Sequence, residues 1–174
     1  SESLAMVKGI TEESVFVFDD SSREYGDEFL REIFPYAESI IIRNINVGAD
    51  ANVHSAMLDF LETKKDYMVI LDSDLLFDSD IINFIKTSIP ITKGFFSVYN
   101  SCIHESKGKV QIGDSQFLAK RTVGAAGMVI SRELVGFIIN EIPLTRKFDW
   151  DICSYLNGQN IPILVSEKSY AQHI

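Results

Sequence analysis

Several features that would place the chain in a specialised class of protein are scarce or absent. There are only two cysteines, Cys102 and Cys153, and they lie far apart without the spacing of metal ligands. We expect two reduced thiols, in the core or near the surface, rather than a disulfide. No apolar run approaches the roughly 18 residues of a membrane-spanning helix, and no signal peptide is visible. We therefore expect no membrane span.

Basic residues are also few. Lys and Arg number 16 against 25 Asp and Glu, which gives a formal net charge of −9. Nonspecific binding to nucleic acid needs a basic surface, so we expect no nucleic-acid partner. The same acidity would repel a diphosphate group unless a bound cation offset its charge.

The stretch with the strongest chemical content is residues 67–77, Tyr-Met-Val-Ile-Leu-Asp-Ser-Asp-Leu-Leu-Phe. Its apolar run predicts a strand that is buried on both faces. Asp72 and Asp74 follow, and residues two apart in an extended chain point the same way. We expect both carboxylates at the carboxyl end of a central strand, where open α/β sheets bind ligands. Such oxygen donors suit Mg²⁺ or Mn²⁺ shared with substrate phosphates.

The first half of the chain alternates between two hydrophobic periods. Strands are predicted at residues 14–18, 38–43 and 67–71, and helices at residues 25–34, 53–61 and 81–89. The last of these helices would be capped by Asp78 or Ser79 and stopped by Pro90. Residues 4–10 are predicted to be the tail of a helix. Strand–helix units of about 30 residues predict a parallel sheet with crossover helices.

The second half is less regular. It predicts strands at residues 94–100, 109–118 and 161–165, with a loop at 105–108, and a small-residue loop that enters a strand at 124–130. Helices are predicted from a Ser131 cap through Ile139 and at residues 150–156. Since we find no repeat, linker or low-complexity segment, we expect one domain, residues 1–174, with halves at 1–100 and 101–174.

Taken together, the chain resembles nucleotide-sugar glycosyltransferases of the GT-A fold, including the large family 2 group. The likeness begins with Asp19-Asp20-Ser21-Ser22 after a strand, and continues with Asn46-Val47-Gly48, a helix, a strand and Asp72-Ser73-Asp74. It covers nearly the whole chain and implies an α/β fold with a Rossmann-like mixed, mostly parallel sheet flanked by helices. Residues 1–13 offer no counterpart of the family's first strand. We therefore expect an N-terminally incomplete catalytic domain that is a piece of a longer protein.

The resemblance implies a donor site in the first half. Asp19, with Asp20 beside it, would contact the uracil or ribose, and Asn46 and Gly48 belong to the family's Asn-x-Gly loop. Asp74 would coordinate Mn²⁺ or Mg²⁺ directly.

The other aspartate of the pair has two implied tasks. Asp72 would hold ribose hydroxyls or join Asp74 at the metal, through a bound water. The competing interpretation is that the pair forms a turn and caps the following helix.

Later segments extend the resemblance to an acceptor site. Residues 123–133 resemble a Gly-Ala-Gly segment that precedes an acceptor-side helix, which implies acceptor contacts at Gly124, Ala125 and Gly127. Close approach of the backbone to a ligand explains such glycines, and tight strand packing explains them equally well. Gln172-His173-Ile174 resembles a Gln-His-Ile-Gly ending whose His binds metal. His173 is therefore either a metal ligand or a solvated side chain, and the sequence leaves both interpretations open.

Residues 148–152 resemble the Glu-Asp-x-x-apolar segment that supplies the catalytic base in inverting members. Phe148 replaces the Glu, so only Asp149 carries over, with Asp151 as the second candidate base. Trp150 would stack on a sugar face or lie in the core. The alternative role of Asp149 is to cap the helix that begins beside it.

The implied function is a metal-dependent glycosyltransferase that moves a sugar from a nucleotide-sugar, expected to be a UDP-sugar, with inversion. The acceptor would be a hydroxyl of a carbohydrate or of a lipid-linked or protein-linked group. We expect the cytoplasm for a bacterial or viral protein and the Golgi lumen for a larger eukaryotic one. Two alternatives remain. The first is a haloacid-dehalogenase-type phosphatase or phosphotransferase in which Asp72 is the nucleophile that becomes phosphorylated, and the second is a noncatalytic carbohydrate-binding domain. His54 and His104 have no partners in sequence and are expected at the surface.

Overall fold

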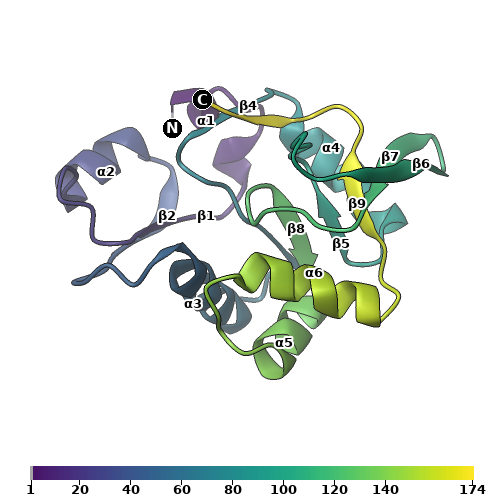
Figure 1. Cartoon of the computed structure of the whole chain (residues 1–174). Coiled ribbons are helices and arrows are strands. Elements are labelled where there is room, and N and C mark those ends of the chain that lie inside the picture. Colours follow the sequence, from purple (N-terminus) through teal and green to yellow (C-terminus); the bar gives the residue numbers. More distant parts are fainter. Residues whose placement is uncertain (1) are drawn as a thin grey trace.

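A six-stranded sheet forms the centre of the computed structural model, which describes residues 2–174 (Figure 1). Across the sheet the strands are β3 (Tyr67–Val69), β8 (Met128–Ser131), β5 (Phe95–Ser97), β9 (Ile163–Ser166), β7 (Ser115–Lys120) and β6 (Ser106–Ile112). Strands β5 and β9 are parallel, whereas the other four pairings are antiparallel. The predicted α/β class is confirmed as a mixed one. A mostly parallel sheet is not confirmed, because β8 runs back between β3 and β5 and β6 and β7 form a hairpin.

Alternating side chains of the central strands fill two hydrophobic clusters, one on each face of the sheet. In β8, Met128 and Ile130 belong to one cluster and Val129 to the other, while Phe95 and Phe96 of β5 divide in the same way. This is the period of two that an extended chain imposes on a sheet with apolar cover on both faces.

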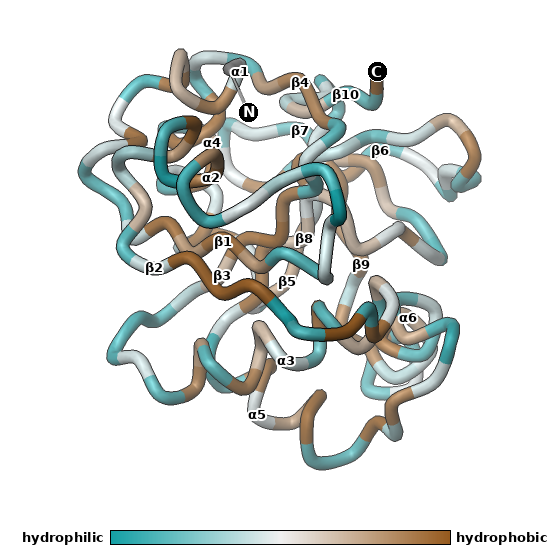
Figure 2. Tube along the Cα trace, turned by 90° about the vertical axis from the view of Figure 1, so that its left-hand side faces the viewer, coloured by the Kyte–Doolittle hydropathy of each residue, from teal (hydrophilic) through white to brown (hydrophobic). Residues whose placement is uncertain are grey.

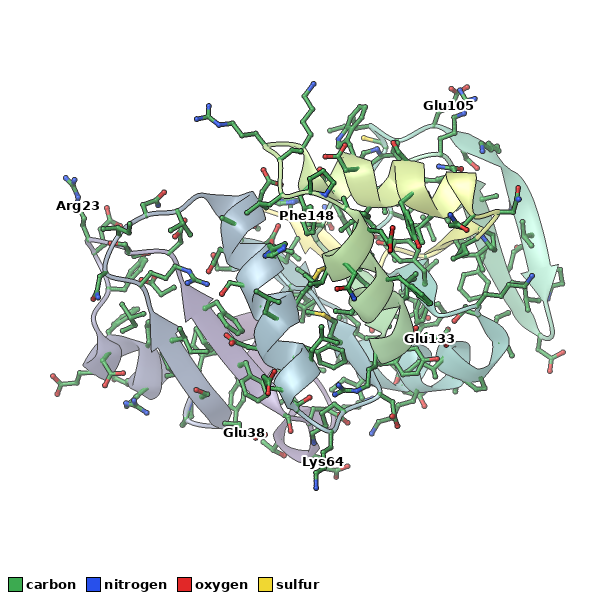
Figure 3. All side chains as sticks on the ribbon, turned by 90° about the horizontal axis from the view of Figure 1, so that it is seen from below. Arg23, Glu38, Lys64, Glu105, Glu133 and Phe148 are labelled. Atoms are coloured by element: carbon green, nitrogen blue, oxygen red, sulfur yellow. The ribbon has the colours of Figure 1, made fainter. Side chains whose placement is uncertain are left out.

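Helices cover both faces of the sheet. The cluster that contains Met128 takes in α3 (Ala49–Glu62), α5 (Arg132–Glu141) and α6 (Phe148–Gly158), which Figure 3 shows side by side from below. The cluster that contains Val129 takes in α1 (Glu2–Ala5), α4 (Ile81–Ser88) and the short helices η1 (Ile10–Glu12) and η2 (Ile89–Ile91). The site described below lies where this scaffold brings α3, α6 and the ends of β3 and β8 together.

A separate parallel pair of strands lies beside the main sheet. It consists of β1 (Val15–Asp19) and β2 (Ala37–Ile42), connected by α2 (Asp27–Ile33). Figure 2 shows both strands as largely hydrophobic, yet apart from Asp19 their residues are only partly buried or exposed. The prediction that residues 67–71 form a central strand buried on both faces was wrong, because most of these residues are only partly buried. The reason is that β3 is the edge strand of the main sheet, to which β1 and β2 are not hydrogen-bonded.

A second small sheet joins two distant parts of the chain. Strand β4 (Leu75–Phe77) pairs antiparallel with β10 (Ala171–His173), and His173 lies opposite Leu75. Neither strand was predicted as a separate element, because residues 75–77 and 171–173 show no alternation of apolar and polar side chains. Their pairing brings the last residues of the chain beside the Asp72–Asp74 loop, and Figure 1 shows the C-terminus next to β4.

Most of the predicted elements are present with shifted ends. The predicted strand at 109–118 is instead the β6–β7 hairpin, which turns at Gly113 with φ +58°, and the predicted loop at 105–108 mostly belongs to β6. Helix α4 has Asp80 rather than Asp78 or Ser79 as its N-cap, because the Asp78 carboxylate accepts the Asp80 N–H in a turn before the helix. The Ser131 cap is confirmed, since its hydroxyl accepts the Leu134 N–H at 3.4 Å.

Two predictions about absent features can also be compared with the structure. Cys102 is exposed and Cys153 is buried, and both are free thiols as expected. Among residues 2–174, no helix combines the length and the hydrophobicity needed to cross a membrane.

Candidate functional site

Three potential metal ligands meet in the loop after β3. Asp72, Asp74 and His173 each offer one ligand atom, and these atoms lie within 4.8 Å of one another. The aspartates occupy a turn rather than an extended strand, so their convergence comes from the loop and not from the predicted alternation. His173 Nδ1 lies 3.2 Å from Asp74 Oδ2 because the β4–β10 pairing aligns the two segments.

The electrostatics of this cluster favour a bound cation. Burial raises the pKa of Asp72, the neighbouring Asp74 raises it further, and His173 lowers it. A carboxylate whose ionisation is opposed by burial and by a neighbouring carboxylate gains from a positive charge nearby. Two carboxylate oxygens and one imidazole nitrogen are a donor set that fits Mn²⁺ or Mg²⁺. The Tyr99 ring meets the His173 ring edge-on, with centroids 5.2 Å apart, and so restricts its orientation.

A cavity of about 350 Å³ connects this cluster to the candidate base. Asp72 and His173 lie on its wall together with Asp149 at the start of α6. The other polar residues that line it are Asp50, Tyr99, Ser101 and His104. Two members of the candidate metal-ligand cluster and a possible proton acceptor thus line the same cavity.

Asp149 has the environment of a general base. It is partly buried in the first turn of α6, and its Oδ1 accepts the Trp150 N–H at 2.8 Å. Burial raises the pKa of Asp149, Asp50 raises it further, and the Trp150 hydrogen bond and His104 lower it. A carboxyl group with a raised pKa that faces a cavity is a better proton acceptor than a fully solvated one.

Phe148 fixes the start of α6 against α3. Its side chain is 1 % exposed, and its N–H donates to Asp50 Oδ1 at 3.2 Å. The His54 ring packs against the Phe148 ring with centroids 5.4 Å apart, and Figure 3 shows Phe148 where α3 and α6 meet. Phe148 is therefore a core anchor that orients Asp149.

The other two candidates in the first turn of α6 do not line the cavity. Asp151 Oδ2 accepts a hydrogen bond from the Thr145 hydroxyl, which directs the carboxylate toward the loop before the helix. Trp150 is 53 % exposed, so it lies neither in the core nor on the cavity wall. Of the three, only Asp149 lines the cavity that Asp72 and His173 also line.

The small-residue segment divides between the two interpretations that the sequence left open. Gly124 and Ala125 line the cavity, and a Cβ on Gly124 would lie 3.9 Å from Asp149 Oδ2. Gly127 does not line it. Its φ is +80°, and a Cβ there would lie 2.8 Å from both the Cβ and the backbone nitrogen of Tyr99. Close ligand approach thus suits Gly124, and tight packing accounts for Gly127.

The predicted nucleotide-contacting residues form a separate hydrogen-bonded group. Asp19 is buried and accepts the Ser22 N–H. The two oxygens of Asp20 accept the N–H groups of Val47 and Gly48, both at 2.8 Å, and Asn46 Nδ2 donates to the Asp20 carbonyl at 2.9 Å. The structure brings Asp20, Asn46 and Gly48 together, with the carboxylate already engaged by the loop.

A larger cavity of about 540 Å³ lies beside that loop. Asn46 and Gly48 line it, along with Arg146 from the segment before α6. Asp50 lines both cavities, so the two adjoin at the first turn of α3. Asn46 and Gly48, which were predicted to contact the nucleotide, therefore lie next to the smaller cavity rather than within it.

Sequence reasoning missed three residues of the site. His104 was predicted at the surface, but it is partly buried and lines the cavity. His54 was also predicted at the surface and is partly buried against Phe148, but it does not line the cavity. Asp50 and Tyr99 carried no local signal, because only the packing of α3 and the pairing of β5 within the sheet place them here.

Comparison with known proteins leaves the family of this chain open. No protein-family model matches the sequence, and no curated protein matches it. What the chain does has to be inferred from the site itself.

Proposed function

We propose that the chain is a metal-dependent glycosyltransferase of the GT-A type that transfers a sugar from a UDP-sugar to a hydroxyl acceptor. The observation that carries this proposal is the cavity whose wall holds Asp72 and His173 together with Asp149. Asp74 does not line that cavity, but its carboxylate lies beside Asp72 and His173. Transfer from a nucleotide-sugar needs charge compensation at the diphosphate and a proton acceptor for the attacking hydroxyl. Residues suited to each task line this cavity.

The order of the elements supports the same proposal. Strand β1, helix α2, strand β2, helix α3 and strand β3 follow one another, and β1 and β2 are parallel. The Asp-x-Asp segment comes directly after β3, and the Asn46–Gly48 loop comes directly before α3. This is the order that the GT-A resemblance implies, in a sheet that is more antiparallel than expected.

Each residue has a separate task in the proposed reaction. Asp72, Asp74 and His173 would hold Mn²⁺ or Mg²⁺, which when bound would offset the charge of the donor diphosphate and of the leaving group. Asp149 accepts the proton of the acceptor hydroxyl as its oxygen attacks the anomeric carbon and the bond to the diphosphate breaks. One such displacement inverts the configuration. Gly124 and Ala125 let the acceptor come close to Asp149.

The donor-side residues act in two ways in this proposal. Asn46 and Gly48 line the adjoining cavity and are available for nucleotide contacts. Asp19 and Asp20 act through the loops that they hold, since their carboxylates accept backbone N–H groups.

The phosphatase alternative has less support. A phosphorylated Asp72 would need a cationic side chain nearby for the phosphate, and among the described residues neither Lys nor Arg lines this cavity. Covalent phosphate on Asp72 after incubation with a phosphoester would favour that alternative over transfer of a sugar.

Calorimetry with UDP, in the presence and absence of Mn²⁺, tests the proposal. We expect binding that depends on the metal and that falls on the order of 100-fold or more in Asp74→Ala. Asp59→Ala is the matched control, because Asp59 is exposed near the C-terminal end of α3 and lines neither cavity. Equal UDP affinity with and without Mn²⁺ would contradict the proposal.

A further inference from the structure

Helix α6 holds a short segment of chain between the hairpin and β8. Asn157 Nδ2 donates to the Arg121 carbonyl at 2.9 Å. One turn earlier in the helix, Cys153 Sγ accepts the Val123 N–H at 3.4 Å and donates to the Val123 carbonyl at 3.6 Å. These contacts fix residues 121–124 against the helix that carries Asp149.

The residues on either side of Val123 lie next to two different groups of the cavity wall. Thr122 Oγ1 is hydrogen-bonded to His104 Nδ1 at 2.9 Å. Gly124 lies beside Asp149, where a Cβ would come within 3.9 Å of Oδ2. His104 and Asp149 line the same cavity, so Thr122 of this segment holds the imidazole at a wall to which α6 brings the carboxylate.

The charges around the two groups set their preferences. Burial lowers the pKa of His104, Lys120 lowers it further, and Asp149 raises it. Lys120 is itself buried and donates to the Ser101 carbonyl at 2.7 Å.

Asp149 has two other titratable neighbours besides His104. Asp50 opposes its ionisation, as does Cys153 in its thiolate form. Burial raises the pKa of the Cys153 thiol to about 11, so that group is neutral near pH 7. His104 is then the neighbour that favours the carboxylate form of Asp149.

We propose that His104, held by Thr122, is a positioning residue that forms an acid–base pair with Asp149. The inference rests on the proposed function, in which Asp149 takes the proton from the acceptor hydroxyl. As the new C–O bond forms, the sugar–phosphate bond breaks and its electron pair stays on the diphosphate. The pair then holds one extra proton, which the imidazole carries as a cation beside the carboxylate and releases to solvent.

Proton NMR titration of the three histidines tests the pair without any need for catalysis. Asp149→Asn keeps an acceptor for the Trp150 N–H but removes the charge, so His104 should titrate at lower pH than in the wild type. Asp151→Asn is the matched control, because that carboxylate faces Thr145, and it should leave the His104 titration in place. An unchanged His104 titration in Asp149→Asn would overturn the proposed pair.

The pH dependence of kcat gives a second readout that a merely structural role would not move. In His104→Gln, loss of the neighbouring cation raises the pKa of Asp149, so the acidic limb should shift to higher pH. Gln retains a hydrogen-bonding group for Thr122, and His54→Gln, which changes the histidine packed on Phe148, should leave the limb in place. An unshifted limb in His104→Gln overturns the inference. Failure of the proposed function would show separately, as loss of metal-dependent UDP binding in the wild type.

Discussion

Two pairs of aspartates follow apolar strands in this chain, and they differ in what their oxygens bind. Asp19 and Asp20, at the end of β1, accept three backbone N–H groups. Asp72 and Asp74, after β3, accept no backbone N–H within residues 2–174, and the neighbour of Asp74 is the His173 ring. The same sequence pattern thus gives two different environments.

The difference shows how to separate a structural carboxylate from a ligand-binding one. Oxygens that accept N–H groups are satisfied by the protein, and they fix the loops around them. Oxygens that face another carboxylate and an imidazole leave negative charge uncompensated. The first pair therefore shapes the loop beside the larger cavity, and the second pair is the one available to a cation.

The largest effect is expected at the third carboxylate, Asp149, which has one oxygen bonded to backbone and the other toward the cavity. Asp149→Asn should lower kcat on the order of 10³-fold, because the amide does not accept the proton. Its calorimetric affinity for UDP and Mn²⁺ should stay at the wild-type value. Retained transfer in Asp149→Asn, with loss in Asp151→Asn instead, would move the base to Asp151.

Gly127→Ala tests the support of the Asp72–Asp74 cluster by Tyr99. The new Cβ would overlap Tyr99, and the alanine would have to keep the positive φ of Gly127. We therefore expect a loss of about 3 kcal/mol in the free energy of unfolding, measured by urea denaturation. Gly124→Ala, which meets only an ordinary contact, should cost less than about 1 kcal/mol. Equal costs at the two glycines would remove the distinction between them.

Asp20→Ala tests the structural role of the Asp19–Asp20 pair, whose carboxylates accept backbone N–H groups. Loss of two hydrogen bonds to a carboxylate should lower the free energy of unfolding by about 2 kcal/mol, while the affinity for Mn²⁺ stays unchanged. Urea denaturation and Mn²⁺ titration measure the two quantities. If Mn²⁺ affinity fell as much as in Asp74→Ala, the two pairs would not differ as described.

The smallest of these effects is expected at His173, the imidazole beside Asp72 and Asp74. His173→Gln should lower Mn²⁺ affinity on the order of tenfold, because two carboxylates remain. His54→Gln provides the control, since that ring packs on Phe148 away from the cluster. Equal Mn²⁺ affinities in the two variants would remove His173 from the ligand set.

Local pattern accounts for much of what could be predicted here. Helices α3, α4 and α5 follow from their apolar spacing, and Ser131 caps α5 as its residue type suggests. Short motifs also singled out Asp72, Asp74 and Asp149, although a turn rather than an extended strand brings the first two together. These features depend on residues that are close together in the sequence.

The parts that escaped prediction depend on distant pairings. Strand β8 lies between β3 and β5, which no local period specifies, and this is why the sheet is largely antiparallel. His104 reaches the cavity because Thr122 holds it, and His173 reaches Asp74 because β10 pairs with β4. Contacts across such separations become visible only when the chain is folded.

The most direct test of the cation site is anomalous diffraction from crystals of the protein grown with Mn²⁺ and UDP. We expect a manganese peak between the Asp72 and Asp74 carboxylates and the His173 ring, with no peak beside Asp20. A map without a peak at the first position, or with the peak beside Asp20 instead, would contradict the account.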